Sequence, residues 1–174
     1  DGPLLKEAAE KGLLTKNPDG SLCTIDFGEF DCGFVDFTSD AGRQWYKDRI
    51  IKQSMLDMGV SGWMADFGEY QPTDMQVASG EDGWKVHNKW PELWARVNAE
   101  AIAEAGLTDD ILFFMRAGYT GSQKYCKLMW AGDQLVDFSR HDGLETAICA
   151  ALSSGLVGNA VSHSGVGGYT TLYG

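Results

Sequence analysis

The chain has 174 residues, 44% of them hydrophobic, so it can bury a sizeable core and lacks the composition of a disordered segment. Its formal net charge is -11 and it holds only 14 Lys and Arg residues, which argues against a nucleic-acid partner because phosphate binding needs clustered cations. No apolar run reaches the roughly 18 residues needed to cross a bilayer, and the first residues do not resemble a signal peptide. We therefore expect no membrane partner and a cytoplasmic location.

The four cysteines, Cys23, Cys32, Cys126 and Cys149, do not form a CxxC pair, and the chain has only 3 histidines. This spacing gives no support to a zinc site or a redox motif. Buried free thiols are the favoured interpretation, and disulfides remain the alternative. We expect no metal and no organic cofactor.

Apolar, β-rich runs alternate with helical patterns along the chain. In order, the expected strands are 33–38, 60–65, 111–115, 128–130 and 157–161. A helix that Ser39-Asp40 would cap follows the first strand, a second covers 84–105 with Pro91 in its first turn, and a third covers 143–152. Strands and helices thus alternate throughout.

Such alternation predicts right-handed βαβ units and a parallel sheet, in an α/β fold. A doubly wound sheet and a (β/α)8 TIM barrel both satisfy the pattern. A closed barrel needs eight units in about 250 residues, so about five βα units would make an incomplete barrel. We expect residues 1–174 to be one partial catalytic domain.

In either architecture the functional groups follow the carboxyl ends of the strands. The polar residues at these ends are Asp66, Arg116, Asp133 and His163. A pair of carboxyl groups is what glycoside cleavage requires: in a retaining enzyme one attacks the anomeric carbon and the other protonates the leaving oxygen. The alternative role for an Asp after a strand is a helix cap.

Two further residues have open roles. His87 lies at the start of the second helix, either as a donor in the pocket wall or as part of an N-terminal cap network. Trp130, three residues before Asp133, belongs either to the core or to a platform for a sugar ring.

The segment GWMADFGEYQPTD at 62–74 closely resembles the nucleophile segment of the sulfoquinovosidase branch of glycoside hydrolase family 31. The resemblance covers nearly the whole chain, and its other segments are HNKWPELWA at 87–95, ILFFMRAGYTGSQKY at 111–125, MWAGDQLVDFS at 129–139 and HSGVGGYTTLYG at 163–174. It implies the third through seventh strands of a catalytic barrel.

The resemblance also implies roles for individual residues. Asp66 matches the nucleophile and Asp133 the general acid and base, Arg116 matches an arginine that binds sugar hydroxyls, and Tyr169 matches a tyrosine that helps to hold a sulfonate. The family carries an aspartate where this sequence has Gly165, so a carboxylate beside the pocket is lost. In the family the other sulfonate-binding residues, an arginine and a tryptophan, lie on an earlier segment that this sequence does not contain.

The expected activity is hydrolysis of α-sulfoquinovosides, such as sulfoquinovosyl glycerol or the plant sulfolipid, by double displacement. The expected partner is a small carbohydrate, and the oligomeric state stays open. A general family 31 α-glucosidase is the first alternative, although DFGE after the strand favours the sulfosugar branch. The second is a non-catalytic carbohydrate-binding fragment.

Overall fold

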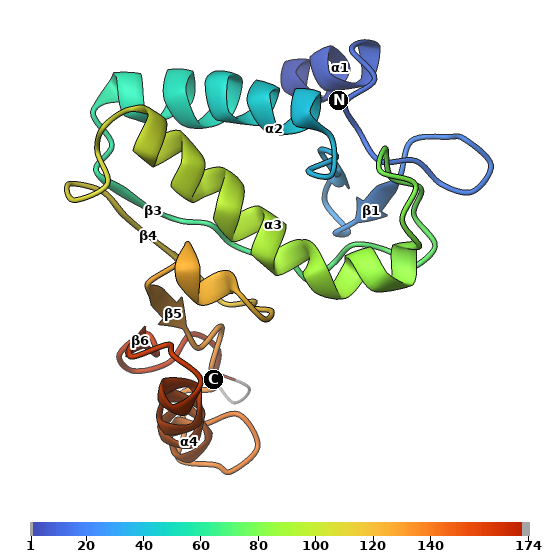
Figure 1. Ribbon diagram of the computed structural model, residues 1–174. Coiled ribbons are helices and arrows are strands. Elements are labelled where there is room, and N and C mark those ends of the chain that lie inside the picture. Colours follow the sequence, from blue (N-terminus) through green and yellow to red (C-terminus); the bar gives the residue numbers. More distant parts are fainter. Residues whose placement is uncertain (1, 172–174) are drawn as a thin grey trace.

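The computed structural model describes residues 2–171 and contains a four-stranded parallel sheet with a long helix along one face and a two-stranded antiparallel hairpin beyond that helix (Figure 1). The sheet strands lie in chain order: β3 (Gly62–Met64), β4 (Leu112–Met115), β5 (Leu128–Trp130) and β6 (Val161–His163). The hairpin joins β1 (Thr24–Asp26) to β2 (Asp31–Gly33). The predicted parallel α/β sheet is confirmed. It is not closed, because β3 and β6 are its two outer strands.

The helices separate these strands. They are α1 (Pro3–Glu10), α2 (Asp40–Tyr46) with its continuation as a π-helix (Lys47–Lys52), α3 (Gly83–Glu104) and α4 (Leu144–Leu156), with short 3-10 turns at Leu56–Met58 and Ser122–Lys124. The predicted cap of α2 is confirmed, since the Ser39 hydroxyl accepts the Gly42 N–H at 3.3 Å. The placing of Pro91 in the first turn of α3 is wrong. The helix begins at Gly83 with Asp82 as its N-cap, so Pro91 lies in the helix interior.

Helix α3 is the centre of the core because it buries side chains on two sides. On one side Val86, Trp90 and Val97 pack with residues of the N-terminal half of the chain. On the other side Ala95 and Ile102 pack against strands β3 and β4. Helix α3 therefore packs between the sheet and the N-terminal half of the chain.

The prediction of a strand over 33–38 is wrong beyond its first residue, and the parallel sheet contains four strands rather than five. The apolar residues of this segment are used for packing instead, and the Phe37 ring lies stacked on Trp94 at 5.5 Å. The carboxylate of Asp36 accepts the backbone N–H groups of Thr38 and Ala78, which bends the chain at this point. The segment therefore forms a turn capped by the Asp36 side chain instead of an extended strand.

The last predicted strand is displaced by four residues. Helix α4 continues to Leu156 rather than ending near Leu152, and the chain turns at Gly158, whose φ is 98°. Strand β6 consequently starts at Val161, where the prediction ended.

The four cysteines are free thiols. Cys23 and Cys126 are buried, as predicted, whereas Cys149 on α4 is exposed and Cys32 is half-buried. The prediction of buried thiols is therefore wrong for Cys149.

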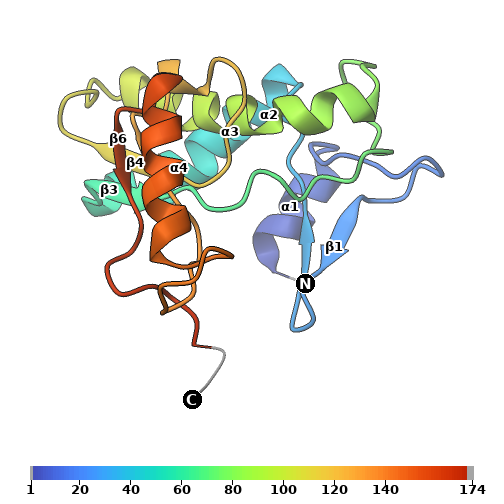
Figure 2. The ribbon, with the colours of Figure 1, turned by 90° about the horizontal axis from the view of Figure 1, so that it is seen from below.

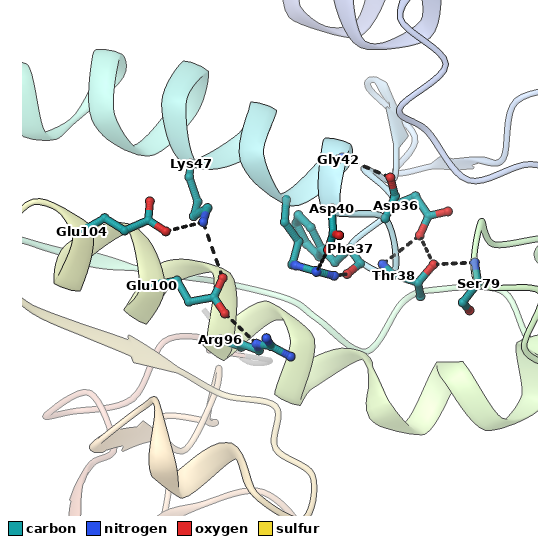
Figure 3. A network of polar contacts seen from close by, with 12 residues as sticks. Asp36, Phe37, Thr38, Asp40, Gly42, Lys47, Ser79, Arg96, Glu100 and Glu104 are labelled. Atoms are coloured by element: carbon teal, nitrogen blue, oxygen red, sulfur yellow. Dashed lines mark hydrogen bonds and ion pairs between the residues drawn. The ribbon is translucent and has the colours of Figure 1, made fainter.

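A buried lysine joins the π-helix to α3 (Figure 3). The Lys47 ammonium group lies 2.5 Å from the Glu104 carboxylate and 3.6 Å from that of Glu100, and its side chain is only 9% exposed. Arg96 donates to the other oxygen of Glu100 at 2.7 Å. These contacts connect the two helices across the side of α3 that faces away from the sheet.

We expect Lys47→Met to lower the free energy of unfolding by about 1 to 3 kcal/mol, because it leaves Glu100 and Glu104 without their shared cation. The cost stays below that of a fully buried pair because both carboxylates reach solvent. Lys52→Met is the matched control, since Lys52 is exposed at the end of the same π-helix. Urea unfolding of both variants measures the difference, and equal midpoints would contradict the prediction.

The sheet face opposite α3 is open. Met64, Leu112 and Val161 are all about half exposed. Helix α4, which stands near β6 at the end of the molecule remote from the hairpin (Figure 2), also leaves Leu152 and Leu156 in solvent. Apolar patches of this kind mark surfaces that pack against other protein.

We expect the isolated chain of residues 1–174 to bind a hydrophobic dye and to self-associate, because the open sheet face and α4 expose apolar side chains beside unpaired strand edges. Leu152→Ser combined with Leu156→Ser should reduce dye binding without loss of helix content. Dye fluorescence and light scattering measure this. A monodisperse chain without dye binding would contradict it.

Candidate active site

The register of the sheet places four of the predicted site residues at the same level. Met64 pairs with Phe114, Phe114 with Leu128, and Leu128 with Val161. The residues two positions further along each strand are Asp66, Arg116, Trp130 and His163. Side chains two positions apart point to the same face of a sheet, so these four lie along one edge on the face opposite α3.

The position of Asp66 is fixed by its backbone. The Ala65 N–H continues the strand pairing by donating to the Phe114 carbonyl at 2.9 Å. The indole N–H of Trp94 donates to the carbonyls of Ala65 and Asp66, both at 3.2 Å. Phe67 then has a φ of 61°, uncommon for a residue with a side chain, and its N–H donates to the Asp66 carboxylate at 2.7 Å.

The Arg116 guanidinium lies between two carboxylates. Its Nη2 and Nε atoms lie 2.6 and 2.8 Å from Glu69 Oε1, and its Nε atom lies 3.3 Å from Asp66 Oδ1. It also lies over the Phe67 ring, with Cζ 4.7 Å from the ring centroid. Burial lowers the pKa of Arg116, but the hydrogen bonds to Glu69 and the nearby charges outweigh this, so the net pKa lies above the ordinary value. Arg116 therefore stays cationic.

Trp130 and His163 continue the edge on the next two strands. Their rings are stacked with centroids 6.4 Å apart, and Phe114 contacts both rings edge-on. Trp130 is only 8% exposed, so it presents little of its ring to a ligand. Together with Arg116, both residues line a hollow of about 430 Å³ whose other wall is α4.

Asp133 follows β5 in an exposed loop. The loop is held by Gln134, whose carbonyl accepts the backbone N–H groups of Tyr169 and Thr170 at 2.8 and 3.1 Å. Within residues 2–171 the Asp133 carboxylate has no hydrogen bond and no ion pair, in contrast to Asp66. The two carboxylates follow strands that lie on either side of β4, so Arg116 is between them in the strand order.

His87 lies in the first part of α3 and contacts the loop that precedes the helix. Its Nδ1 atom lies 2.5 Å from the Gln71 carbonyl oxygen, which requires a hydrogen on Nδ1. Asp82 is the N-cap of the helix, and the hydrogen bond of His87 connects α3 to the segment before it. His87 lines a second hollow, of about 440 Å³, with Glu69 and Arg116.

Tyr169 lies outside this group of side chains. It is 75% exposed, and its backbone N–H donates to the Gln134 carbonyl at 2.8 Å. Gly165 has a φ of 67°, where a side chain is strained, although an added Cβ would meet nothing within 4 Å. Gly165, where the resemblance implies an aspartate in the family, therefore has a backbone conformation typical of glycine.

Two residues of the site were not predicted in their roles. The sequence presents Glu69 only as part of the DFGE segment, although a carboxylate just after a strand end follows the same rule that indicates Asp66. Trp94 packs against the core and also donates its indole N–H to the backbone of the strand end. The sequence gives only a weak signal for this second role, because Trp94 also fits the apolar spacing of a core helix.

The sequence profile of the glycosyl hydrolases family 31 TIM-barrel domain matches residues 1–173. The chain belongs to glycoside hydrolase family 31. The predicted fold class, an incomplete (β/α)8 barrel, is thereby confirmed.

Three relatives are similar over almost the whole chain. The sulfoquinovosidase of Agrobacterium fabrum is 57% identical over 174 residues, and that of Escherichia coli 50% over 173. A GH31 family sulfoquinovosidase from E. rectale, solved in complex with an aza-sugar inhibitor, is 54% identical and superposes with a TM-score of 0.95 over 99% of this chain. The chain spans about a quarter of each relative: 26% of the first, 25% of the second and 26% of the third.

Among the helices described for residues 2–171, none combines the length and the apolar composition that a membrane span requires. The same residues hold no cluster of three or more His, Cys, Asp or Glu side chains that could bind a metal ion.

Proposed function

We propose that the protein containing this chain is a retaining glycosidase that hydrolyses α-sulfoquinovosides, with Asp66 as nucleophile and Asp133 as general acid and base. The observation that carries the proposal is the strand order, in which both carboxylates follow strands that flank Arg116 at one edge of the sheet. The identity to relatives named sulfoquinovosidases supports the choice of sugar.

In the first step a carboxylate oxygen of Asp66 attacks the anomeric carbon. The bond from that carbon to the leaving oxygen breaks as protonated Asp133 transfers its proton to that oxygen. In the second step a water molecule, deprotonated by Asp133, attacks the anomeric carbon and breaks the ester to Asp66. The sugar leaves with its original anomeric configuration, and both carboxyl groups return to their starting states.

The two carboxylates are suited to different roles by their surroundings. Asp66 Oδ1 lies 3.3 Å from Arg116 Nε and accepts the Phe67 N–H at 2.7 Å, so the carboxylate of the proposed nucleophile is held in one orientation. Asp133 lies in the loop after β5, exposed to solvent. Strands on either side of a third lie about 10 Å apart, so a retaining spacing of about 5 Å requires the two side chains to converge over Arg116.

Arg116 and Tyr169 complete the proposed sugar site. Two of the five guanidinium N–H groups of Arg116 are directed to Glu69, which leaves others for sugar hydroxyls. Tyr169 is exposed and offers a phenolic hydroxyl for the sulfonate. Trp130, His87 and His163 line the walls of the two hollows that share Arg116.

The test is the incubation of the full-length protein with sulfoquinovosyl glycerol and with glucosyl glycerol, followed by proton NMR. We expect release of sulfoquinovose that appears first as the α-anomer, and little release of glucose. Preferential release of glucose would favour the general α-glucosidase, and binding of either glycoside without turnover would favour the non-catalytic alternative.

A cytoplasmic location is part of the proposal. Its support is the four free thiols, including exposed Cys149, since exposed thiols persist in reducing compartments. Fractionation of the producing cells tests it.

A further inference from the structure

Glu69 makes contacts that differ from those of an ordinary surface carboxylate. Both of its short contacts go to one partner, Arg116, through the single oxygen Oε1 at 2.6 and 2.8 Å. Its other oxygen, Oε2, is buried and has no hydrogen-bond partner within the described chain. The polar contacts of Glu69 in residues 2–171 thus serve Arg116 and no other part of the fold.

Arg116 has two carboxylates within reach and binds them unequally. Its Nε atom lies 3.3 Å from Asp66 Oδ1, beyond the range of a short charge-assisted hydrogen bond, while both contacts to Glu69 are short. The side chain of Arg116 is 17% exposed, so water compensates its charge only weakly. An arginine in such a site pairs strongly with whichever carboxylate can approach it.

We propose that Glu69 is a positioning residue that withdraws Arg116 from the nucleophile. Without Glu69, Asp66 is the remaining carboxylate beside the guanidinium, and a bidentate pair between them would occupy both nucleophilic oxygens. With Glu69 in place, Arg116 is held over the Phe67 ring and keeps N–H groups free for the sugar. The effect on catalysis rests on the proposed function. The position that Arg116 takes without Glu69 does not depend on it.

The groups around the guanidinium are consistent with this role. Phe67 and Tyr70, from the same loop as Glu69, lie with ring centroids 4.7 and 5.7 Å from Arg116 Cζ. His87, from α3, lines the hollow on the Glu69 side. Asp66 and Glu69 are the two carboxylates that face the guanidinium in the described chain.

The first experiment is structural and needs no activity. Crystal structures of the full-length protein with Glu69→Gln and with Glu69→Ala should show the Arg116 guanidinium moved onto Asp66, with two contacts below 3.3 Å where the unaltered chain has one at 3.3 Å. Glu69→Gln preserves the size of the side chain and serves if the alanine variant does not fold. An Arg116 that keeps its position in both variants would overturn the proposal.

The second experiment is a double-mutant cycle on an activated aryl α-sulfoquinovoside. We expect Glu69→Gln to lower kcat about 100-fold, the size of effect that misplacement of a reacting group produces, with a smaller change in KM. In an Arg116→Met background the same substitution should leave kcat unchanged, because its effect passes through Arg116. Equal losses in both backgrounds would overturn the proposal.

Glu81→Gln is the matched control. It removes an ion pair of similar length, 2.9 Å to Lys89, at the start of α3 and should leave kcat unchanged. If the unaltered protein cleaves no glycoside at all, the proposed function fails, and the crystal structures still decide whether Glu69 holds Arg116 away from Asp66.

Discussion

Asp66→Ala should abolish turnover of every glycoside that the full-length protein accepts, with a loss in kcat of about 10⁴-fold or more. Removal of the nucleophile leaves no route to the glycosyl ester, and a better leaving group cannot compensate because the bond to carbon is still not made. Initial rates on alkyl and aryl α-sulfoquinovosides measure the loss.

The fold should survive this substitution, which makes the loss interpretable. Arg116 keeps its two short contacts to Glu69, and the carbonyl of residue 66 can still accept the Trp94 indole N–H. Asp109→Ala is the matched control, since Asp109 is exposed and precedes β4 at the opposite end of the sheet. It should leave kcat unchanged.

A covalent label provides a second measurement on the same residue. A fluorinated α-sulfoquinovosyl fluoride should lose fluoride to the attacking carboxylate and leave its sugar as an ester on the peptide that contains Asp66. Mass spectrometry locates the label. A label on another residue, or full activity of Asp66→Ala, would show that the nucleophile is assigned wrongly.

The strand-end rule predicted where the site residues lie because it depends only on where apolar runs stop. Asp66, Arg116 and His163 each follow or end a strand, and the register brings them to one level. The rule holds even where boundaries were wrong, as with β6, since a shift of four residues along the chain left His163 at the strand end.

Contacts within the site were beyond prediction because they depend on backbone turns. The chain reverses after Asp66 through Phe67 at a φ of 61° and Gly68 at 101°, which returns Glu69 to the guanidinium. Nothing in the periodicity of the segment indicates a left-handed conformation at a phenylalanine. The pairing of Glu69 with Arg116 therefore became visible only in three dimensions.

The sequence did not predict the β1–β2 hairpin. Strands β1 and β2 have only three residues each, too few to show an alternation of apolar and polar residues. The segment after Gly33 is apolar, and its composition alone indicated a strand. In the structure the Phe37 ring packs on Trp94 and Asp36 caps a turn, so tertiary packing favours another conformation.

Asp133→Ala should separate from Asp66→Ala by its dependence on the leaving group. General acid assistance is worth about 10² to 10⁴ in rate, and it is needed only where the leaving oxygen is a poor one. On an alkyl glycoside such as sulfoquinovosyl glycerol we expect nearly the full loss, whereas on an activated aryl α-sulfoquinovoside the first step should keep much of its rate. Stopped-flow release of the aryl group measures that step.

The second step of Asp133→Ala should be rescued by azide. Without its base the variant accumulates the ester on Asp66, and azide attacks the anomeric carbon without giving up a proton, so it needs no carboxylate to activate it. Asp133 is exposed and has no hydrogen bond or ion pair within residues 2–171, so its removal opens space beside the sugar at little cost in stability. The expected product is a glycosyl azide of the same configuration as the substrate, identified by NMR. Equal losses on both substrates, with no azide product, would mean that the acid and base is another residue.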